Sequence, residues 1–194
     1  TLNAGQTCIA PDYVLVPEGQ QERFAASARR MFAAMYPDIA SNNDYTSIVS
    51  PRHFSRLQEL AALAQAQGAS ALPLSNMAPD AATRRFPPVL LTGVQDGMRV
   101  MQEEIFGPIL PVIPYTAIDD AIAYVNAHPR PLALYLFEKN RATIDRVMQE
   151  TVAGGVSIND TLLHIAQDDL PFGGVGASGM GSYHGEYGFA TFSK

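Results

Sequence analysis

The segments Leu132-Ala-Leu-Tyr-Leu-Phe137, Asn140 to Glu150 and Gly155-Val-Ser-Ile-Asn159 follow one another and decide the fold. The first and third are short apolar runs typical of buried strands, and the second carries apolar residues at helical spacing. Strands that are joined through a helix of about ten residues form a crossover, which makes them parallel. This stretch therefore predicts a strand-helix-strand unit of an α/β protein.

The same alternation runs through the rest of the chain. Apolar runs typical of strands occupy residues 9–16, 89–91 and 109–113, and helical spacing covers residues 20–35, 51–64 and 116–125. The second helix has a clear start, because Ser50 can cap it and Pro51 suits the first helical position. The prolines in 109–113 imply a bulge or a sheet edge. We predict one doubly wound α/β domain with a mostly parallel sheet over residues 1–194.

Composition narrows the class of protein. The 194 residues are 47% hydrophobic and 16% charged, as in ordinary globular domains. A net charge of -6 argues against nucleic acid as a partner, because such binding depends on clustered Lys and Arg. Neither a long apolar segment nor a leader sequence is present, so we expect a cytoplasmic protein without a membrane segment. The single cysteine excludes an internal disulfide and a cysteine-based zinc cluster, and we predict no metal site.

That cysteine is the first candidate for chemistry. Cys8 follows the turn sequence Asn3-Ala-Gly-Gln-Thr7 and precedes an apolar strand. Backbone N–H groups of such a turn can favour the thiolate and stabilise an oxyanion on an attacked carbonyl. Taken alone, a lone cysteine can equally be a small, inert, buried side chain.

Two further segments carry polar or glycine-rich motifs. Glu103-Glu-Ile-Phe-Gly-Pro108 is either a pair of solvated acids before a turn or a carboxylate that accepts hydrogen bonds from a diol, with an aromatic ring beside it. Residues 174–179 match G-x-G-x-x-G, but they follow no apolar strand and precede no helix. We therefore interpret 171–188 as a close-packed loop rather than a phosphate-binding loop.

Histidines offer an alternative chemistry, that of a Cys-His hydrolase. We assign surface or packing roles to all four, and keep His164 and His184 as candidates because their segments can border the site. The other two are His53 and His128. Asn159, at the end of a strand, is interpreted as a turn or cap residue.

Three motifs occur in an order that resembles the aldehyde dehydrogenase superfamily. They are Gly5-Gln-Thr-Cys-Ile-Ala-Pro-Asp-Tyr13, Met101-Gln-Glu-Glu-Ile-Phe-Gly-Pro-Ile109 and Pro171-Phe-Gly-Gly-Val-Gly-Ala-Ser-Gly-Met-Gly-Ser-Tyr-His-Gly185. The resemblance spans nearly the whole chain. It is closest to the class 3 branch, which includes fatty, aromatic and coniferyl aldehyde dehydrogenases.

The resemblance implies roles for individual residues. Cys8 would be the nucleophile that forms a thiohemiacetal, which gives a hydride to NAD(P) and leaves a thioester for hydrolysis by water that a glutamate activates. The Cys8 N–H would be half of an oxyanion hole. Glu104 would bind the nicotinamide ribose with Phe106 packed nearby, and Glu103 would be structural. Phe172 would line the aldehyde tunnel.

The family also implies parts that these residues do not supply. It uses an N-terminal cofactor-binding domain, an oxyanion asparagine, a lysine and a general-base glutamate, whereas seven residues precede Cys8. We therefore expect residues 1–194 to be the thiol-bearing catalytic domain of a longer, homodimeric enzyme, with the cofactor domain absent, and to be inactive alone.

The expected substrate is an aromatic aldehyde such as coniferaldehyde, or a fatty aldehyde, and the choice between NAD and NADP stays open. Two alternatives remain. One is an acylating or acyl-phosphate-reducing relative of the same fold, whose thioester leaves in a different way. The other is a non-catalytic binding or structural segment.

Overall fold

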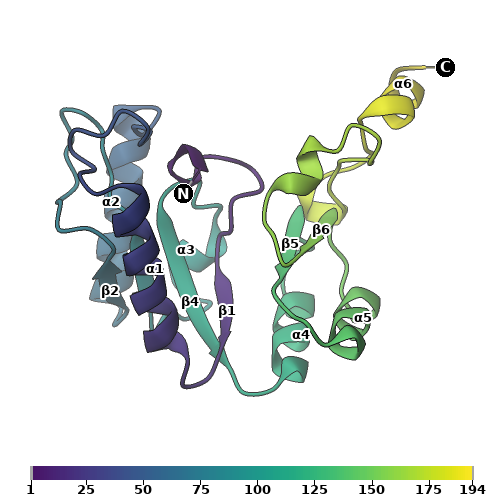
Figure 1. Ribbon diagram of the computed structural model, residues 1–194, viewed down its shortest axis with the longest axis horizontal. Helices are drawn as coiled ribbons and strands as arrows, with labels where there is room; N and C mark the ends of the chain where they lie inside the picture. The colour runs from purple at the N-terminus through teal and green to yellow at the C-terminus, as the bar shows by residue number, and fades with distance from the viewer. Residues whose placement is uncertain (1, 194) are drawn as a thin grey trace. The chain divides into compact units, whose positions relative to one another are not determined.

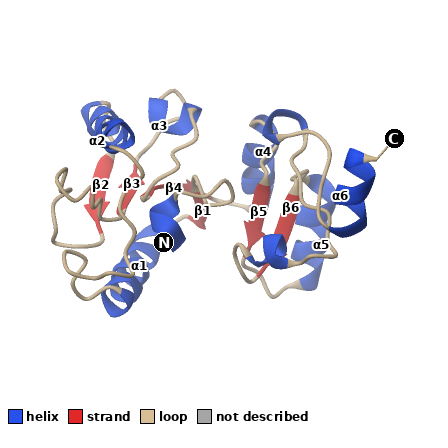
Figure 2. Ribbon diagram, turned by 90° about the horizontal axis from the view of Figure 1, so that it is seen from above, coloured by secondary structure: helices blue, strands red, loops and turns tan. Residues whose placement is uncertain are grey.

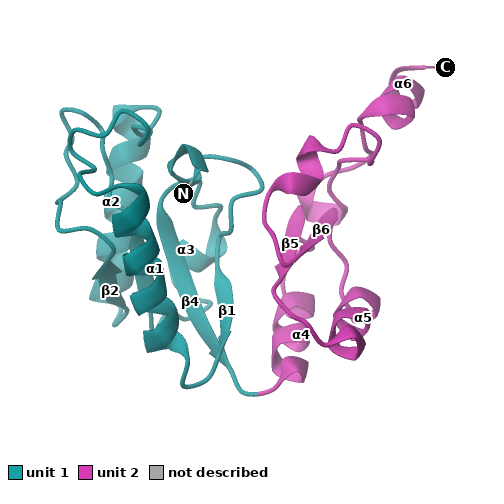
Figure 3. Ribbon diagram, viewed as in Figure 1, with its two compact units in different colours: residues 1–116 teal, residues 117–194 magenta. Residues whose placement is uncertain are grey.

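A computed structural model describes residues 2–193, which divide into two compact units, residues 1–116 and 117–194 (Figure 3). The first unit contains a short 3-10 turn at Leu2–Gly5, then β1 (Val14–Pro17), α1 (Gln21–Met35), α2 (Pro51–Ala66), β2 (Ser70–Pro73), β3 (Val89–Thr92), α3 (Arg99–Gln102) and β4 (Ile109–Tyr115). The second contains α4 (Ile118–Ala127), β5 (Ala133–Leu136), α5 (Arg141–Glu150), β6 (Gly155–Ile158), 3-10 turns at Leu163–Ala166 and Gly176–Ser178, and α6 (Gly185–Phe192) (Figure 1).

The first unit is built on a four-stranded sheet with the order β1-β4-β3-β2. β4 pairs in parallel with both β1 and β3, and β2 joins the far edge of β3 in the antiparallel direction. Figure 2 shows α1 on one face of this sheet and α2 with α3 on the other. The predicted α/β class with mostly parallel pairing is confirmed, although the strands of the chain are shared between two sheets.

β4 is a central strand with unbroken register on both sides, so the predicted edge or bulge is wrong. Successive residues of a parallel strand direct their polar groups to opposite neighbours. The Pro108 carbonyl accepts from the Val89 N–H, so even-numbered residues face β3 and odd-numbered residues face β1. The backbone of Pro111 faces β1, but the pairing of β4 with β1 begins only at the next residue, Val112. The backbone of Pro114 faces β3, whose pairing with β4 has already ended at Val112. Neither proline removes a donor that the sheet uses.

α2 supplies much of the core of the first unit. Its start is as predicted, with Pro51 in the first turn and the Ser50 hydroxyl accepting from the His53 N–H at 3.2 Å. Many fully buried side chains of this core come from α2, from the loop before β3 and from the central strands, among them Phe54, Leu57, Leu60, Phe86, Leu91, Ile109 and Val112. α2 is therefore held rigidly against the sheet. The side chains on its first turns, such as His53 and Arg56, start from a fixed position.

The helical spacing over residues 20–35 marks more apolar positions than the fold buries. In α1 Phe32 is buried, but Met31 and Met35 are about half exposed, because only a narrow face of the helix packs on the sheet. β2 was not predicted, since Ser70-Ala-Leu-Pro73 is too short and mixed to show a strand pattern. Its pairing with β3 supplies the order that its own sequence does not.

The second unit contains the strand-helix-strand unit that the sequence predicted. β5 and β6 pair in parallel, and the Asn140 side chain caps α5 by accepting from the Thr143 N–H. Ile144 and Val147 face inward, whereas Met148 is about half exposed. No strand leads into the glycine-rich segment 174–179, which contains a 3-10 turn at Gly176–Ser178. The predicted loop over 171–188 is too long, because α6 begins at Gly185, and the rejection of a phosphate loop stays a prediction.

α6 was not predicted, because the glycines around it hide its helical spacing. Across residues 2–193, no helix is both long enough and apolar enough to span a bilayer.

Candidate active site

The loop before Cys8 adopts an unusual backbone conformation. Asn3, Ala4 and Gly5 all lie in the left-handed region, with φ of 50°, 52° and 74°. The turn ends by presenting Cys8 at the surface, so the burial expected in the alternative interpretation of this thiol is wrong. Among the hydrogen bonds of residues 2–193, none is donated by the Cys8 N–H. That N–H group is therefore available to an external acceptor.

Hydrogen bonds of the Gln6 side chain connect this turn to residues 47–49 of the same unit. Its side chain is buried, donates to the Asn3 carbonyl at 3.1 Å and the Ser47 carbonyl at 3.2 Å, and accepts from the Val49 N–H at 2.8 Å. The Asn3 side chain in turn donates to the Gln6 carbonyl at 3.0 Å. Sequence reasoning gave Gln6 no role, since its partners are more than 40 residues away. It acts as a clamp that sets the position of the next residues, including Cys8.

The thiol loop also touches the acidic motif through two glycines. A Cβ on Gly5 would lie 2.5 Å from the Gly107 carbonyl oxygen, and one on Gly107 would lie 2.5 Å from a methyl group of Leu57. The backbone of Gly5 thus packs on the backbone of Gly107, and Gly107 packs on the buried Leu57 side chain, so neither position has room for a larger residue without a shift of its neighbours. The segments around Cys8 and Glu104, about a hundred residues apart in the sequence, are neighbours in the fold.

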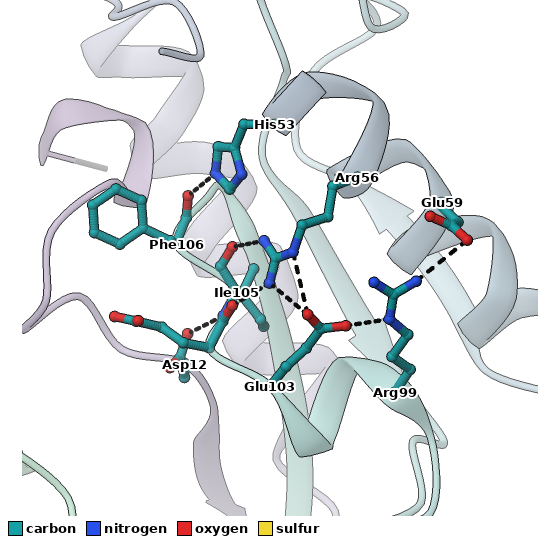
Figure 4. A network of polar contacts seen from close by, with 9 residues as sticks. Asp12, His53, Arg56, Glu59, Arg99, Glu103, Ile105 and Phe106 are labelled. Atoms are coloured by element: carbon teal, nitrogen blue, oxygen red, sulfur yellow. Dashed lines mark hydrogen bonds and ion pairs between the residues drawn. The ribbon is translucent and has the colours of Figure 1, made fainter. Parts of the chain in front are cut away.

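The two acids of the motif have different environments. Arg56 donates to one oxygen of Glu103 at 3.1 and 3.3 Å, and Arg99 binds the other (Figure 4). Burial acts to raise the pKa of Glu103, but these hydrogen bonds outweigh it and hold the pKa below its usual value. The Glu104 side chain is exposed and forms no hydrogen bond or ion pair within the described chain. Glu103 is thus structural, as expected, and Glu104 has a free carboxylate.

α2 also binds the backbone of the motif. Arg56 donates to the carbonyl groups of Glu104 and Ile105, the latter at 2.9 Å. The next carbonyl, that of Phe106, lies 2.7 Å from Nε2 of His53 (Figure 4). Three consecutive carbonyl groups are therefore bound by side chains from one helix. His53, for which the sequence suggested only a surface or packing role, contacts a candidate cofactor residue directly.

Asp12 joins the thiol segment to the motif from the other side. Its carboxylate accepts from the Ile105 N–H at 3.1 Å. Burial raises the pKa of Asp12 to about 6, and the nearby Glu104 charge adds to the effect, while the Ile105 hydrogen bond and Arg56 oppose it. The sequence gave no sign of this role, because the contact spans 93 positions.

The remaining candidates belong to the second unit. Phe172 is 6% exposed and packs against His164, Tyr183 and His184, with ring centroids 5.4–5.9 Å away. His164 lies 3.1 Å from the Ser157 hydroxyl, and burial lowers the pKa of the imidazole. The tunnel-lining role of Phe172 stays a prediction.

Asn159 was interpreted as a turn or cap residue, and the structure agrees. Its φ is 59°, and its side chain exchanges two hydrogen bonds with the backbone of Glu138, at 2.8 and 3.0 Å. These bonds continue the β5–β6 pairing by one step beyond the end of β6. Asn159 therefore orders the strand end.

An exposed thiol lies on a left-handed turn whose backbone packs against the segment that carries a free carboxylate, and both belong to an α/β scaffold. This arrangement fits a thiol-dependent α/β enzyme. The family profile of the aldehyde dehydrogenases matches residues 1–194. The chain belongs to the aldehyde dehydrogenase family.

Individual relatives agree with this assignment. The chain is 54% identical over 194 residues to a probable coniferyl aldehyde dehydrogenase of Pseudomonas aeruginosa, covering all of this chain and 40% of that protein. It is 46% identical over 193 residues to aldehyde dehydrogenase family 3 member A2 of Mus musculus, covering 99% of this chain and 38% of that protein. The class 3 resemblance is thus confirmed. The chain spans about 40% of the length of the curated relatives that it matches.

Solved structures give the same result for the fold. The substrate-bound AldH of Staphylococcus aureus superposes with a TM-score of 0.90 at 44% identity, over 97% of this chain and 40% of that one. The loops and sheets described above are therefore those of an aldehyde dehydrogenase.

Proposed function

We propose that the whole protein oxidises aldehydes to carboxylic acids with NAD(P), and that Cys8 is its nucleophile. The observation that carries the proposal is the exposed Cys8 thiol on a clamped turn, next to an N–H group that has no partner within residues 2–193. Thiol attack needs both an accessible sulfur and a donor for the oxygen that becomes negatively charged. This one residue supplies both.

The chemistry at Cys8 then follows in balanced steps. The thiolate sulfur forms a bond to the aldehyde carbon, and the carbonyl π electrons move to oxygen, which accepts a hydrogen bond from the Cys8 N–H. The tetrahedral thiohemiacetal becomes a thioester when the carbon gives up its hydrogen with the bonding pair. Water then attacks the thioester, and the carbon–sulfur bond breaks to release the acid and the thiol. This route divides one difficult reaction into two easier ones.

The acidic motif fits the cofactor of this family, whose members depend on NAD(P). When bound, the nicotinamide ring supplies the acceptor for the hydride. The exposed, unpartnered Glu104 carboxylate suits the two hydroxyl groups of a ribose, because an ionised carboxylate accepts several hydrogen bonds. The half-buried Phe106 ring, two residues further on, offers an apolar surface beside it. We therefore assign Glu104 and Phe106 to the nicotinamide ribose and its surroundings.

For the substrate we propose an aromatic aldehyde such as coniferaldehyde, or a fatty aldehyde. Support comes from the names of the relatives, which include a probable coniferyl aldehyde dehydrogenase at 54% identity. We also propose that the whole protein is a cytoplasmic homodimer and that Phe172 lines the path of the aldehyde. The thiol in this assignment is the only cysteine of residues 1–194, which makes it straightforward to test.

The test is Cys8→Ser in the whole protein, assayed with coniferaldehyde and a long-chain aldehyde through the absorbance of the reduced nicotinamide. We expect kcat to fall by at least about a thousandfold, the order of loss seen when a covalent nucleophile is removed. The serine variant should keep its affinity for the reduced cofactor. Undiminished turnover by the variant would refute the role of Cys8, and a wild-type protein that oxidises neither aldehyde would refute the proposed substrate class.

A matched pair tests the cofactor assignment. Glu104→Gln should raise the Kd of NAD(P) about tenfold to a hundredfold, because hydrogen bonds to charged groups contribute about 1.5–3 kcal/mol. Glu103→Gln should lower the melting temperature instead, since it breaks the contacts with Arg56 and Arg99. Equal effects of the two variants on cofactor affinity would contradict the assignment.

A further inference from the structure

The segment that carries Glu104 and Phe106 is held in an unfavourable backbone conformation. Phe106 has a φ of 51°, in the left-handed region that bulky residues rarely adopt and that costs about 1–3 kcal/mol. Such a conformation persists only where surrounding contacts impose it. The question is which side chain imposes it at Phe106.

His53 is the side chain that meets this residue. Its Nε2 lies 2.7 Å from the Phe106 carbonyl oxygen, and the two rings approach edge to face with centroids 6.0 Å apart. A carbonyl oxygen only accepts hydrogen bonds, so Nε2 carries the proton and donates it. His53 thus binds both the backbone and the ring of Phe106.

The base of His53 is itself rigid. Its N–H is capped by the Ser50 hydroxyl at the start of α2, and the neighbouring Phe54 and Leu57 are fully buried. Because the imidazole has few rotatable bonds and starts from a fixed turn, it can hold a backbone carbonyl in one place. Arg56, one turn further along α2, binds the two preceding carbonyl groups and leaves that of Phe106 to His53.

We infer that His53 is a positioning residue, which acts through its hydrogen bond to Phe106 to hold that ring in place for the cofactor. This inference rests on the proposed role of Phe106 and deepens it. His53 does not touch the reacting atoms, and its effect is on the geometry of the cofactor side of the site. Removal of the imidazole should loosen Phe106 and weaken cofactor binding while Cys8 remains as reactive as before.

The experiment compares three variants of the whole protein. His53→Ala removes the donor, and His53→Gln keeps an N–H donor at nearly the same reach. The matched control is His128→Ala, which removes a ring nitrogen 2.7 Å from the Tyr124 carbonyl in the second unit. Each protein is measured for the Kd of NADH and NADPH, for KM and kcat, for melting temperature, and for hydrogen exchange of the peptide that contains Phe106.

We expect His53→Ala to raise the Kd and the KM for the cofactor about three- to tenfold, the range that one lost hydrogen bond gives, with a much smaller change in kcat. Hydrogen exchange at Phe106 should rise, His53→Gln should restore most of the affinity, and His128→Ala should bind the cofactor like the wild type. These results together would support the inference.

Other results overturn it. If His53→Ala lowers only the melting temperature and leaves the Kd and the exchange at Phe106 unchanged, His53 is merely structural. If His53→Gln is as weak as His53→Ala, the hydrogen bond is not the cause. The proposed function fails separately, through active Cys8→Ser or inactive wild-type protein, and the exchange at Phe106 still reports on the inference in that case.

Discussion

Replacement of Asp12 by Asn should change how the stability of this protein depends on pH. The variant keeps a side-chain oxygen that can accept from the Ile105 N–H, 3.1 Å away in the wild type, but it removes the charge. In the folded protein burial raises the pKa of Asp12 from 3.8 to about 6. The folded state therefore binds the Asp12 proton more tightly than the unfolded state does, and folding is linked to that proton.

The sign and size follow from these values. A raised carboxyl pKa contributes stability that is fully present below pH 3.8 and is lost as the pH rises through about 6. One pKa unit corresponds to 1.36 kcal/mol, so the wild type should lose up to about 3 kcal/mol from Asp12 over this interval. Water at the exposed part of the side chain makes the loss smaller than this upper value. Asn has no proton to lose, so Asp12→Asn escapes the loss.

Urea unfolding at about pH 4 and about pH 7 measures the effect as the change in unfolding free energy between the two proteins. The difference should shift in favour of Asp12→Asn by up to about 2 kcal/mol as the pH is raised. Asp38→Asn provides a control of opposite sign, because a hydrogen bond from Ser41 lowers the pKa of Asp38. A difference between wild type and Asp12→Asn that is the same at both pH values would refute the reasoning.

Three substitutions test the packing around the site. Gly5→Ala should destabilise the protein by about 2 kcal/mol or more in urea unfolding and change the alkylation rate of the thiol, because its Cβ meets the Gly107 carbonyl at 2.5 Å; an alanine variant as stable as wild type would show that no close contact exists. Gln6→Ala should cost about 2–4 kcal/mol, since it removes three hydrogen bonds made by a buried side chain, and a loss well under 1 kcal/mol would argue against the clamp. Tyr45→Phe should cost about 1–2 kcal/mol in thermal or urea unfolding, because it removes the 2.6 Å hydrogen bond to the buried Phe86 carbonyl; a neutral effect would contradict that bond.

Much of the fold could be predicted from local patterns. The cap at Ser50 and the strand-helix-strand unit are encoded within short stretches, so spacing and turn chemistry were enough to find them. The prolines of β4 misled the prediction because their effect depends on which neighbour each residue faces, and the pairing of distant strands decides that. Local sequence does not contain this information.

For the candidate site, too, local motifs could be interpreted from the sequence, whereas contacts between distant residues could not. The structural role expected for Glu103 agrees with its ion pairs, and the roles of Cys8 and Glu104 stay predictions. The residues that position them were missed, namely Gln6, Asp12, His53 and Arg56. Each acts on a backbone group 40 or more positions away, and isolated polar residues of this kind look the same as solvated ones until the chain is folded.

The contact between Gly5 and Gly107 has a consequence for how this protein can vary. Because two backbones without side chains set the spacing between the thiol loop and the acidic segment, that spacing does not depend on the identity of the residues that face the ligand. Mutation or selection can therefore alter the side chains around the thiol while the distance between the thiol loop and the acidic segment stays constant. The pair of glycines thus separates the geometry of the site, which the backbone fixes, from its surface chemistry, which side chains can change.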